Sequence, residues 1–307
     1  MDVAFRHEAG IYTGADEFVR LASSFLSRAL DAGDPALVLV DADKGSRLRS
    51  ALGEHPTVTY GDIRAVGRNP AHLIPAWTAF VAANRDAGAL WGIGEPLWPE
   101  RSPSERAECH QHEALLNVAL ADDAILTLLC PIDRGGLAAD DVTAAVNCHP
   151  ALRDATGIQH NAAYLPVDAT ALLSAPLPPP PPDAETFAFT SADLRELRDR
   201  VRRLATDTGF DADRAADIVL AVDEVASNSH RHGGGGGTLV SWRAGNWLVC
   251  EVRDAGRFTD PMVGRTAPPS SDIGGRGLWI ANQLCDVVQV RSSDVGAVVR
   301  MHARTDA

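Results

Sequence analysis

The chain has 307 residues, of which 45% are hydrophobic and 22% charged, and its formal net charge is −13. This length is typical of two domains, and the acidic balance disfavours direct binding to nucleic acid or to an anionic membrane surface. No stretch approaches the roughly 20 apolar residues of a membrane span, and residues 1–10 lack the apolar run of a signal peptide. We therefore expect a cytoplasmic protein.

Cysteine and lysine usage disfavours two further kinds of site. The five cysteines are widely spaced and form no CxxC pair, so we expect reduced cysteines and neither a disulfide framework nor a structural zinc site. Lys44 is the only lysine, and Gly45 follows it where a GxxxxGK[ST] phosphate loop requires serine or threonine. The chain therefore has no such loop.

The first part of the chain alternates helix and strand patterns. Apolar residues recur at helical spacing over residues 18–29, and residues 70–86 and 103–121 are further predicted helices. Short apolar runs predict strands at 36–40, 57–63, 89–93 and 124–130. Because such alternation is typical of parallel strands covered by helices, we predict an α/β domain with a mostly parallel sheet.

A proline-rich segment divides the chain. Residues 176–182 contain six prolines, which cannot continue a helix or a central strand and favour an extended, stiff spacer. We therefore predict a first domain over residues 1–174, a linker over 175–186 and a second domain over 187–307.

The second part has a different order of elements. Residues 191–206 and 213–232 are predicted helices, and the five glycines at 233–237 end the second of them. Strands are predicted at 238–243 and 247–253, a helix at 277–284, and a last pair of strands at 287–291 and 297–302. Helices beside a hairpin-rich sheet predict an α+β sandwich.

Three short patterns in this part share an order that carries more information than each pattern alone. Glu224, Asn228 and His232 lie four residues apart and share one helix face. Asp254 and Gly256 follow a predicted strand, where a carboxylate can accept from an amine and a glycine lets a ring approach the backbone. A glycine-rich turn at residues 274–277 precedes a helix, a place suited to phosphate.

This order resembles the GHKL ATPase superfamily, which includes gyrase, Hsp90, histidine kinases and mismatch-repair ATPases. Within it, residues 224–233 and 274–286 are most similar to the signature segments of the anti-sigma factor/serine kinase family, and the resemblance covers about residues 187–303. It implies a Bergerat-type ATP-binding sandwich (a histidine kinase/Hsp90-like ATPase domain) that uses ATP and Mg²⁺. The chain departs from the family at Gly296-Ala297, where glycine-threonine is common.

The resemblance also implies roles for individual residues. Asn228 would ligate Mg²⁺, and Glu224 would orient or deprotonate the attacking hydroxyl. Asp254 would accept from the adenine amine, with Gly256 beneath the ring. The phosphate-facing set would be Gly274, Gly275, Gly277 and Leu278, residues 258–273 would form a lid over ATP, and His232 would be either a supporting residue or an ordinary helix-end histidine.

The first part resembles the MEDS sensory domain, an α/β module related to RecA-like folds. The residues that carry the resemblance are His7 and Tyr12 at the first strand, Glu113 with Asn117, and the segments 94–98 and 129–133. It implies a RecA-like sheet without a phosphate loop and a sensory role for a small-molecule signal. His7 and Tyr12 are the candidate ligand contacts, although they could equally form a satisfied core pair.

The run Cys109-His110-Gln111-His112-Glu113 invites a metal-site hypothesis. On a helix, Cys109 shares a face with His112 or Glu113, but a metal site needs three or four converging ligands. No partner cluster stands at a suitable spacing, so we expect no metal here.

The two resemblances together predict a regulator. The leading hypothesis is an anti-sigma-type protein that binds ATP·Mg²⁺ and phosphorylates a serine or threonine of an anti-anti-sigma (STAS-type) partner, sequesters a sigma factor, or does both, under control of the first domain. A homodimer is compatible with this role.

Two other hypotheses compete with this one, and the first of them is disfavoured. A sensor histidine kinase needs a phosphoacceptor histidine on a helical hairpin before the ATPase domain, and residues 184–206 leave no room for one. An ATP-binding interaction module without kinase activity is not separated by sequence from an active kinase.

Overall fold

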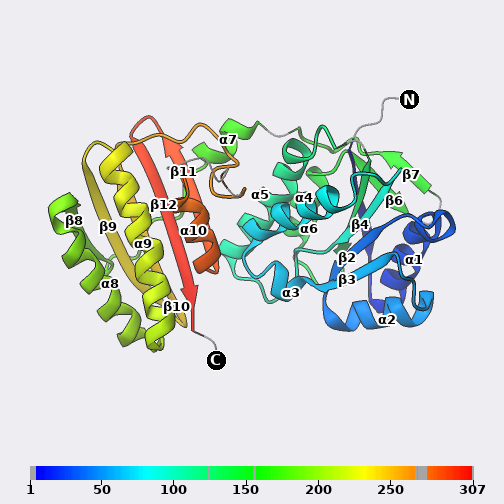
Figure 1. Cartoon of the computed structure of the whole chain (residues 1–307), viewed down its shortest axis with the longest axis horizontal. Coiled ribbons are helices and arrows are strands. Elements are labelled where there is room, and N and C mark those ends of the chain that lie inside the picture. The colour runs from blue at the N-terminus through cyan, green and yellow to red at the C-terminus, as the bar shows by residue number, and fades with distance from the viewer. Residues whose placement is uncertain are drawn as a thin grey trace. The chain divides into compact units, whose positions relative to one another are not determined.

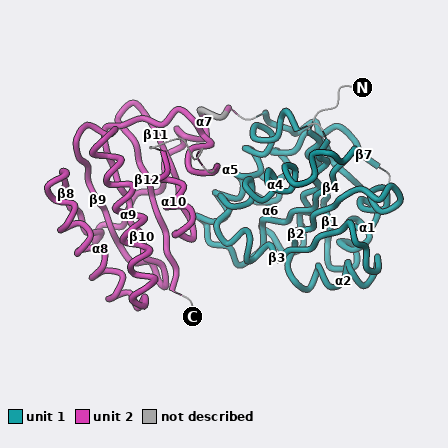
Figure 2. Tube along the Cα trace, viewed as in Figure 1, with its two compact units in different colours: residues 1–167 teal, residues 168–307 magenta. Residues whose placement is uncertain are grey.

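Two β-sheets, each with its own helices, form the described part of the chain in a computed structural model (Figure 1). The structure describes residues 5–123, 125–154, 157–166, 168–266, 268 and 275–305. The sheets belong to two units, Met1–Val167 and Asp168–Ala307 (Figure 2). None of the described helices is both long and apolar enough to cross a membrane.

The first unit contains a seven-stranded sheet with the order β3-β2-β4-β5-β1-β6-β7. All neighbouring strands pair in parallel except β6 and β7, which form an antiparallel pair at one edge. The prediction of a mostly parallel sheet is therefore confirmed. The strands are β1 (Arg6–Tyr12), β2 (Ala36–Val40), β3 (Val58–Asp62), β4 (Leu90–Gly94), β5 (Leu126–Asp133), β6 (Ala151–Asp154) and β7 (Gly157–His160).

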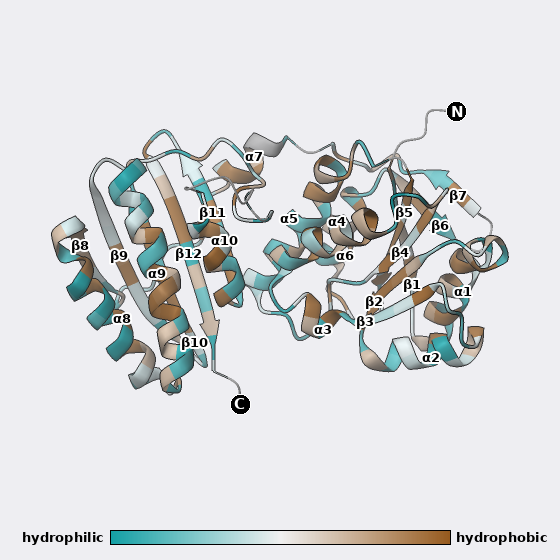
Figure 3. Ribbon diagram, viewed as in Figure 1, coloured by the Kyte–Doolittle hydropathy of each residue, from teal (hydrophilic) through white to brown (hydrophobic). Residues whose placement is uncertain are grey.

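Helices cover both faces of this sheet, and Figure 3 shows hydrophobic central strands between them. Because side chains alternate along a strand, Tyr12 of β1 joins the core under α1, whereas Ala9 joins the core under α5 and α6. A capping box between Ser102 and Glu105 begins α5. The helices are α1 (Ala15–Ala32), α2 (Ala42–Leu52), α3 (Ile63–Val66), η1 (Pro70–His72), α4 (Leu73–Ala83), α5 (Pro103–Ala119) and α6 (Ala139–Asn147).

The second unit contains a five-stranded antiparallel sheet with the order β11-β12-β10-β9-β8. Its helices α8, α9 and α10 share one hydrophobic core with the sheet, which confirms the predicted α+β sandwich. The elements are α7 (Ala169–Ser174), β8 (Glu185–Thr190), η2 (Ser191–Asp193), α8 (Leu194–Thr208), α9 (Ala212–His232), β9 (Gly236–Ala244), β10 (Trp247–Asp254), α10 (Gly277–Leu284), β11 (Val287–Ser293) and β12 (Gly296–Arg304).

The proline-rich segment lies against this second sheet. Leu248, Cys250 and Val252 of β10 point into the helix-covered core, so Glu251 points to the opposite face. On that face Arg300 donates a hydrogen bond of 2.7 Å to the carbonyl of Pro178. The preceding helix α7 contacts β11, so the described contacts divide the chain after residue 167, earlier than the predicted boundary after residue 174.

Candidate functional site

Helix α9 presents the first part of the predicted site. Asp211 caps its N-terminus by accepting from the backbone N–H of Arg214 at 2.8 Å. Val222 and Val225 are buried in the core of the second unit, whereas Glu224 and Asn228 are only partly buried. Packing of the apolar side against the core thus fixes the orientation of the polar side, which carries Glu224 and Asn228.

Asp254 is held between the end of β10 and the end of α9. One carboxylate oxygen accepts from Ser229 Oγ at 2.5 Å, and the other accepts from the backbone N–H of Gly256 at 2.7 Å. A Cβ on Gly233 would lie 2.4 Å from Cγ of Asp254, so only glycine allows this approach. Ser229 and Gly233 are positioning residues that the sequence patterns did not single out.

The glycine-rich turn meets α9 at Asn228. A Cβ on Gly277, the first residue of α10, would lie 2.5 Å from Nδ2 of Asn228 and 3.2 Å from Oε2 of Glu224. Gly275 has a φ of +84°, which favours glycine. Leu278 is buried and belongs to the core. Gly274 lies outside the described residues, as do residues 267 and 269–273 of the predicted lid.

A cavity of about 290 Å³ connects these parts. Asp254 and Gly256 line it together with Asn228 and Gly275, and its apolar lining comes from Phe258, Val263, Leu278 and Ala297. Glu224 is not among the lining residues, although it lies beside Gly277. The volume of the cavity is near the lower end of the usual range for small-molecule sites.

The residues present fit ATP and Mg²⁺. A carboxylate at an apolar-walled slot suits the amine edge of a flat ring, and a Cβ on Gly256 would lie 2.8 Å from Oδ1 of Asp254, so a side chain there would crowd the carboxylate. Asn228 offers an amide oxygen, a donor type that Mg²⁺ accepts together with phosphate oxygens. That oxygen accepts from Arg231 at 3.0 Å in this structure. The turn at Gly275 and Gly277 brings its backbone close to Asn228.

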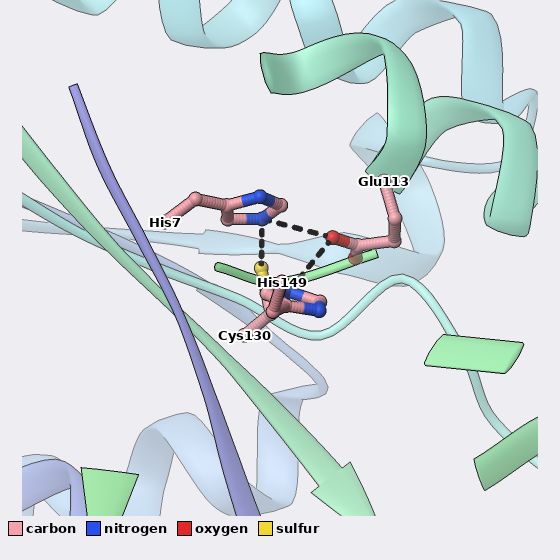
Figure 4. Close-up of side chains that lie close together, drawn as sticks. All are labelled: His7, Glu113, Cys130 and His149. Carbon is pink, nitrogen blue, oxygen red and sulfur yellow. Dashed lines mark hydrogen bonds and ion pairs between the residues drawn. The ribbon is translucent and has the colours of Figure 1, made fainter. Parts of the chain in front are cut away.

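In the first unit, His7 and Tyr12 do not form a pair. They are five residues apart on β1 and therefore point to opposite faces of the sheet. Tyr12 donates to Glu95, which also accepts from Lys44 Nζ at 2.7 Å. His7 lies beside Glu113, Cys130 and His149 (Figure 4). Each residue thus belongs to its own buried polar group.

Comparison with known proteins gives both units a family. Residues 187–303 match the model of the histidine kinase-like ATPase domain, so the second unit has the GHKL fold, and the family implies ATP binding. Residues 6–150 match the model of MEDS, the methanogen/methylotroph, DcmR sensory domain. The chain therefore joins an N-terminal MEDS domain to a C-terminal histidine kinase-like ATPase domain. No curated protein matches the sequence.

Three solved structures show partial similarity. The RsbU and RsbW domains of Rv1364c from Mycobacterium tuberculosis are 20% identical, with a TM-score of 0.31, over 40% of this chain and 32% of that one. The KaiC-like protein PH0186 from Pyrococcus horikoshii OT3 is 15% identical, with a TM-score of 0.34, over 49% and 69%. Acinetobacter baumannii histidine kinase AdeS is 10% identical, with a TM-score of 0.24, over 40% and 68%. The chain spans about a third of the mycobacterial structure.

The buried Glu95 gives the first unit a pH-dependent stability. Burial raises the pKa of Glu95 from 4.5 to about 7, although the ion pair with Lys44 opposes the shift. Between those pH values the folded chain holds a proton on Glu95 that the unfolded chain has lost, so the contribution of Glu95 to stability falls by about 3 kcal/mol as the pH rises. In urea titrations, Glu95→Gln should gain stability relative to wild type across this window. A pH-independent difference would contradict the assignment.

Proposed function

We propose that this protein is an anti-sigma-type regulator that binds ATP·Mg²⁺ in its C-terminal domain. It would phosphorylate a serine or threonine of a STAS-type anti-anti-sigma partner, sequester a sigma factor, or do both, with the MEDS domain setting the output. The observation that carries the proposal is the convergence of Glu224, Asn228 and Gly277 beside a cavity that Asp254 also lines.

Each side chain has a separate task in this proposal. Asp254, fixed by Ser229 and Gly256, accepts from the adenine amine. Asn228 supplies an oxygen to Mg²⁺, which neutralises charge on the phosphates when bound. Glu224 stands one helical turn before Asn228, where it accepts the proton of the attacking hydroxyl or orients it.

The choice of a protein hydroxyl as acceptor is supported by the elements that precede the ATPase domain. Between α7 and α8 the structure describes the proline-rich segment, β8 and the short helix η2, and β8 pairs with β9 as part of the ATPase sheet. This described stretch contains no helical hairpin that could carry a phosphoacceptor histidine. The similarity of residues 224–233 and 274–286 to the anti-sigma factor/serine kinase family supports the same acceptor class.

ATP binding tests the site itself. Asn228→Ala and Asp254→Asn should each weaken Mg²⁺-dependent ATP binding by about tenfold or more, because each removes one polar contact to the charged or buried part of the ligand. Equilibrium binding with a fluorescent ATP analogue measures the change. Asp217→Ala removes an exposed carboxylate from the same helix and is the matched control. Affinity like that of wild type in both site variants would overturn the assignment.

A further inference from the structure

Four side chains from distant parts of the first unit meet in its interior. His7 comes from β1, Glu113 from α5, Cys130 from β5, and His149 from the segment before β6 (Figure 4). All four residues are buried, and one nitrogen, oxygen or sulfur atom of each lies within 4.8 Å of the other three. Among residues 109–113, the expectation of no converging partners is wrong for Glu113, because its partners lie far away in the sequence.

Three of the six separations among the four atoms can be compared with the edges of a metal site. Oε2 of Glu113 lies 3.1 Å from Nε2 of His7 and 3.2 Å from Nε2 of His149. Sγ of Cys130 lies 3.3 Å from Nε2 of His7. With metal–ligand bonds of about 2.1 Å, the edges of a tetrahedral zinc site are about 3.4 Å long. These three separations are close to that value, and the other three are within 4.8 Å.

Hydrogen bonds on the far side of each imidazole determine which nitrogen faces the centre. His149 donates from Nδ1 to the carbonyl of Ala145 at 2.7 Å. His7 bonds from Nδ1 to Oδ1 of Asn117 at 3.1 Å. Asn117 in turn donates from Nδ2 to the carbonyl of Cys148 at 2.8 Å, which fixes the orientation of its amide and makes its oxygen the acceptor. In the neutral form, each ring therefore turns the Nε2 lone pair inward.

This arrangement gathers more acceptors than hydrogens, because the Cys130 thiol supplies a single hydrogen, within reach of Nε2 of His7. Two imidazole lone pairs approach the same carboxylate oxygen, and Nε2 of His149 has no hydrogen-bond partner among the described residues. Buried acceptors that face one another need a cation between them. That cation is either a proton on one imidazole or a metal ion. Orienting partners on the outer nitrogens are a usual feature of metal-bound histidines.

We propose that His7, Glu113, Cys130 and His149 form a buried binding site for one divalent transition metal ion. Two imidazoles, one thiolate and one carboxylate suit Zn²⁺ or Co²⁺ and disfavour Mg²⁺ or Ca²⁺, which prefer all-oxygen sites. The Cys130 thiol releases its proton on binding. The site is independent of the ATP-binding residues, which lie in the other unit, and it gives the sensory domain a specific chemical input.

Cobalt binding to the full-length protein tests the proposal. After treatment with a chelator, wild type should bind one Co²⁺ per chain, with the visible bands of tetrahedral cobalt and a near-ultraviolet thiolate-to-cobalt band, and Zn²⁺ should displace it. X-ray absorption of the zinc form should show one sulfur with nitrogen or oxygen neighbours. This measurement needs no variant. A lack of stoichiometric binding, or binding without a sulfur neighbour, would overturn the site.

Variants test the individual ligands. Cys130→Ser should lose the thiolate band, whereas Cys109→Ser, a buried cysteine that contacts the carbonyl of Pro96, should keep it. Asn117→Ala should weaken metal binding by about 10–100-fold, because His7 loses its orienting partner. Retained ATP binding shows that each variant chain is folded in its other unit. An unchanged thiolate band in Cys130→Ser would show that another cysteine binds the cobalt, and would overturn the proposed site.

Discussion

Glu224→Gln is expected to lower phosphotransfer to a STAS-type partner by a factor of about 10²–10⁴ while ATP affinity stays close to that of wild type. Phosphotransfer and ATP affinity should respond differently because of where Glu224 lies. Glu224 lies beside Gly277 but is not part of the cavity lining, whereas Asn228 and Asp254 line the cavity. Glutamine keeps the shape and polarity of the side chain but cannot accept a proton. Only the rate of phosphotransfer should therefore fall.

Transfer of label from [γ-³²P]ATP to the partner measures the effect, together with equilibrium ATP binding by the same variant. Asp223→Asn is the matched control, because Asp223 occupies the same turn of α9 but pairs with Arg198 of α8 at 3.0 Å. If Glu224→Gln labels the partner as wild type does, Glu224 is not the base. Phosphohistidine on this chain would support a histidine kinase instead.

The parts of the fold with strong local patterns could be predicted from the sequence. The stripe of apolar residues in α1 and the apolar runs of β2 and β4 are local signals, and the structure places these elements close to the predicted ranges. The strands β6 and β7 at one end of the first sheet and the edge strand β8 of the second sheet were missed. Their residues are mostly half-buried in β6 and mostly exposed in β7 and β8, so they lack the apolar runs that identify buried strands.

The prediction that the five glycines at 233–237 all lie between α9 and the next strand is only partly right. Gly236 and Gly237 belong to β9, although a run of five glycines is not typical of a strand. A Cβ on Gly236 would lie 2.3 Å from the carbonyl oxygen of Phe189, and a Cβ on Gly237 would lie 2.6 Å from that of Arg253. The need for glycine arises from neighbouring strands, which no local pattern reveals.

The same distinction applies to the sites. The order of Glu224, Asp254 and Gly277 could be read along the chain, but the contacts that hold them together could not. Ser229 and Gly233 look like ordinary helix-end residues until Asp254 is seen between them. The cluster of His7, Glu113, Cys130 and His149 is the extreme case, because its members come from four separate elements and follow no spacing rule.

The largest expected effect on stability belongs to the sheet face that the proline-rich segment contacts. The buried carboxylate of Glu251 accepts from Nε of Arg300 at 2.6 Å, and it also pairs with Arg253. Only 6% of the Arg300 side chain is exposed, compared with 46% for Arg253. Glu251→Leu should therefore cost about 3–5 kcal/mol, because it leaves the Arg300 guanidinium buried without its charge partner.

Hydrogen exchange of the β10 and β12 amides in the full chain measures this free energy. Arg253→Ala breaks the exposed half of the network and should cost about 1 kcal/mol or less. The double variant Glu251→Leu/Arg300→Leu should be more stable than Glu251→Leu alone, because two apolar side chains replace a broken pair, even though the bond from Arg300 to Pro178 is lost. If the double variant is the less stable of the two, the Arg300–Pro178 contact matters more to this face than the ion pair does.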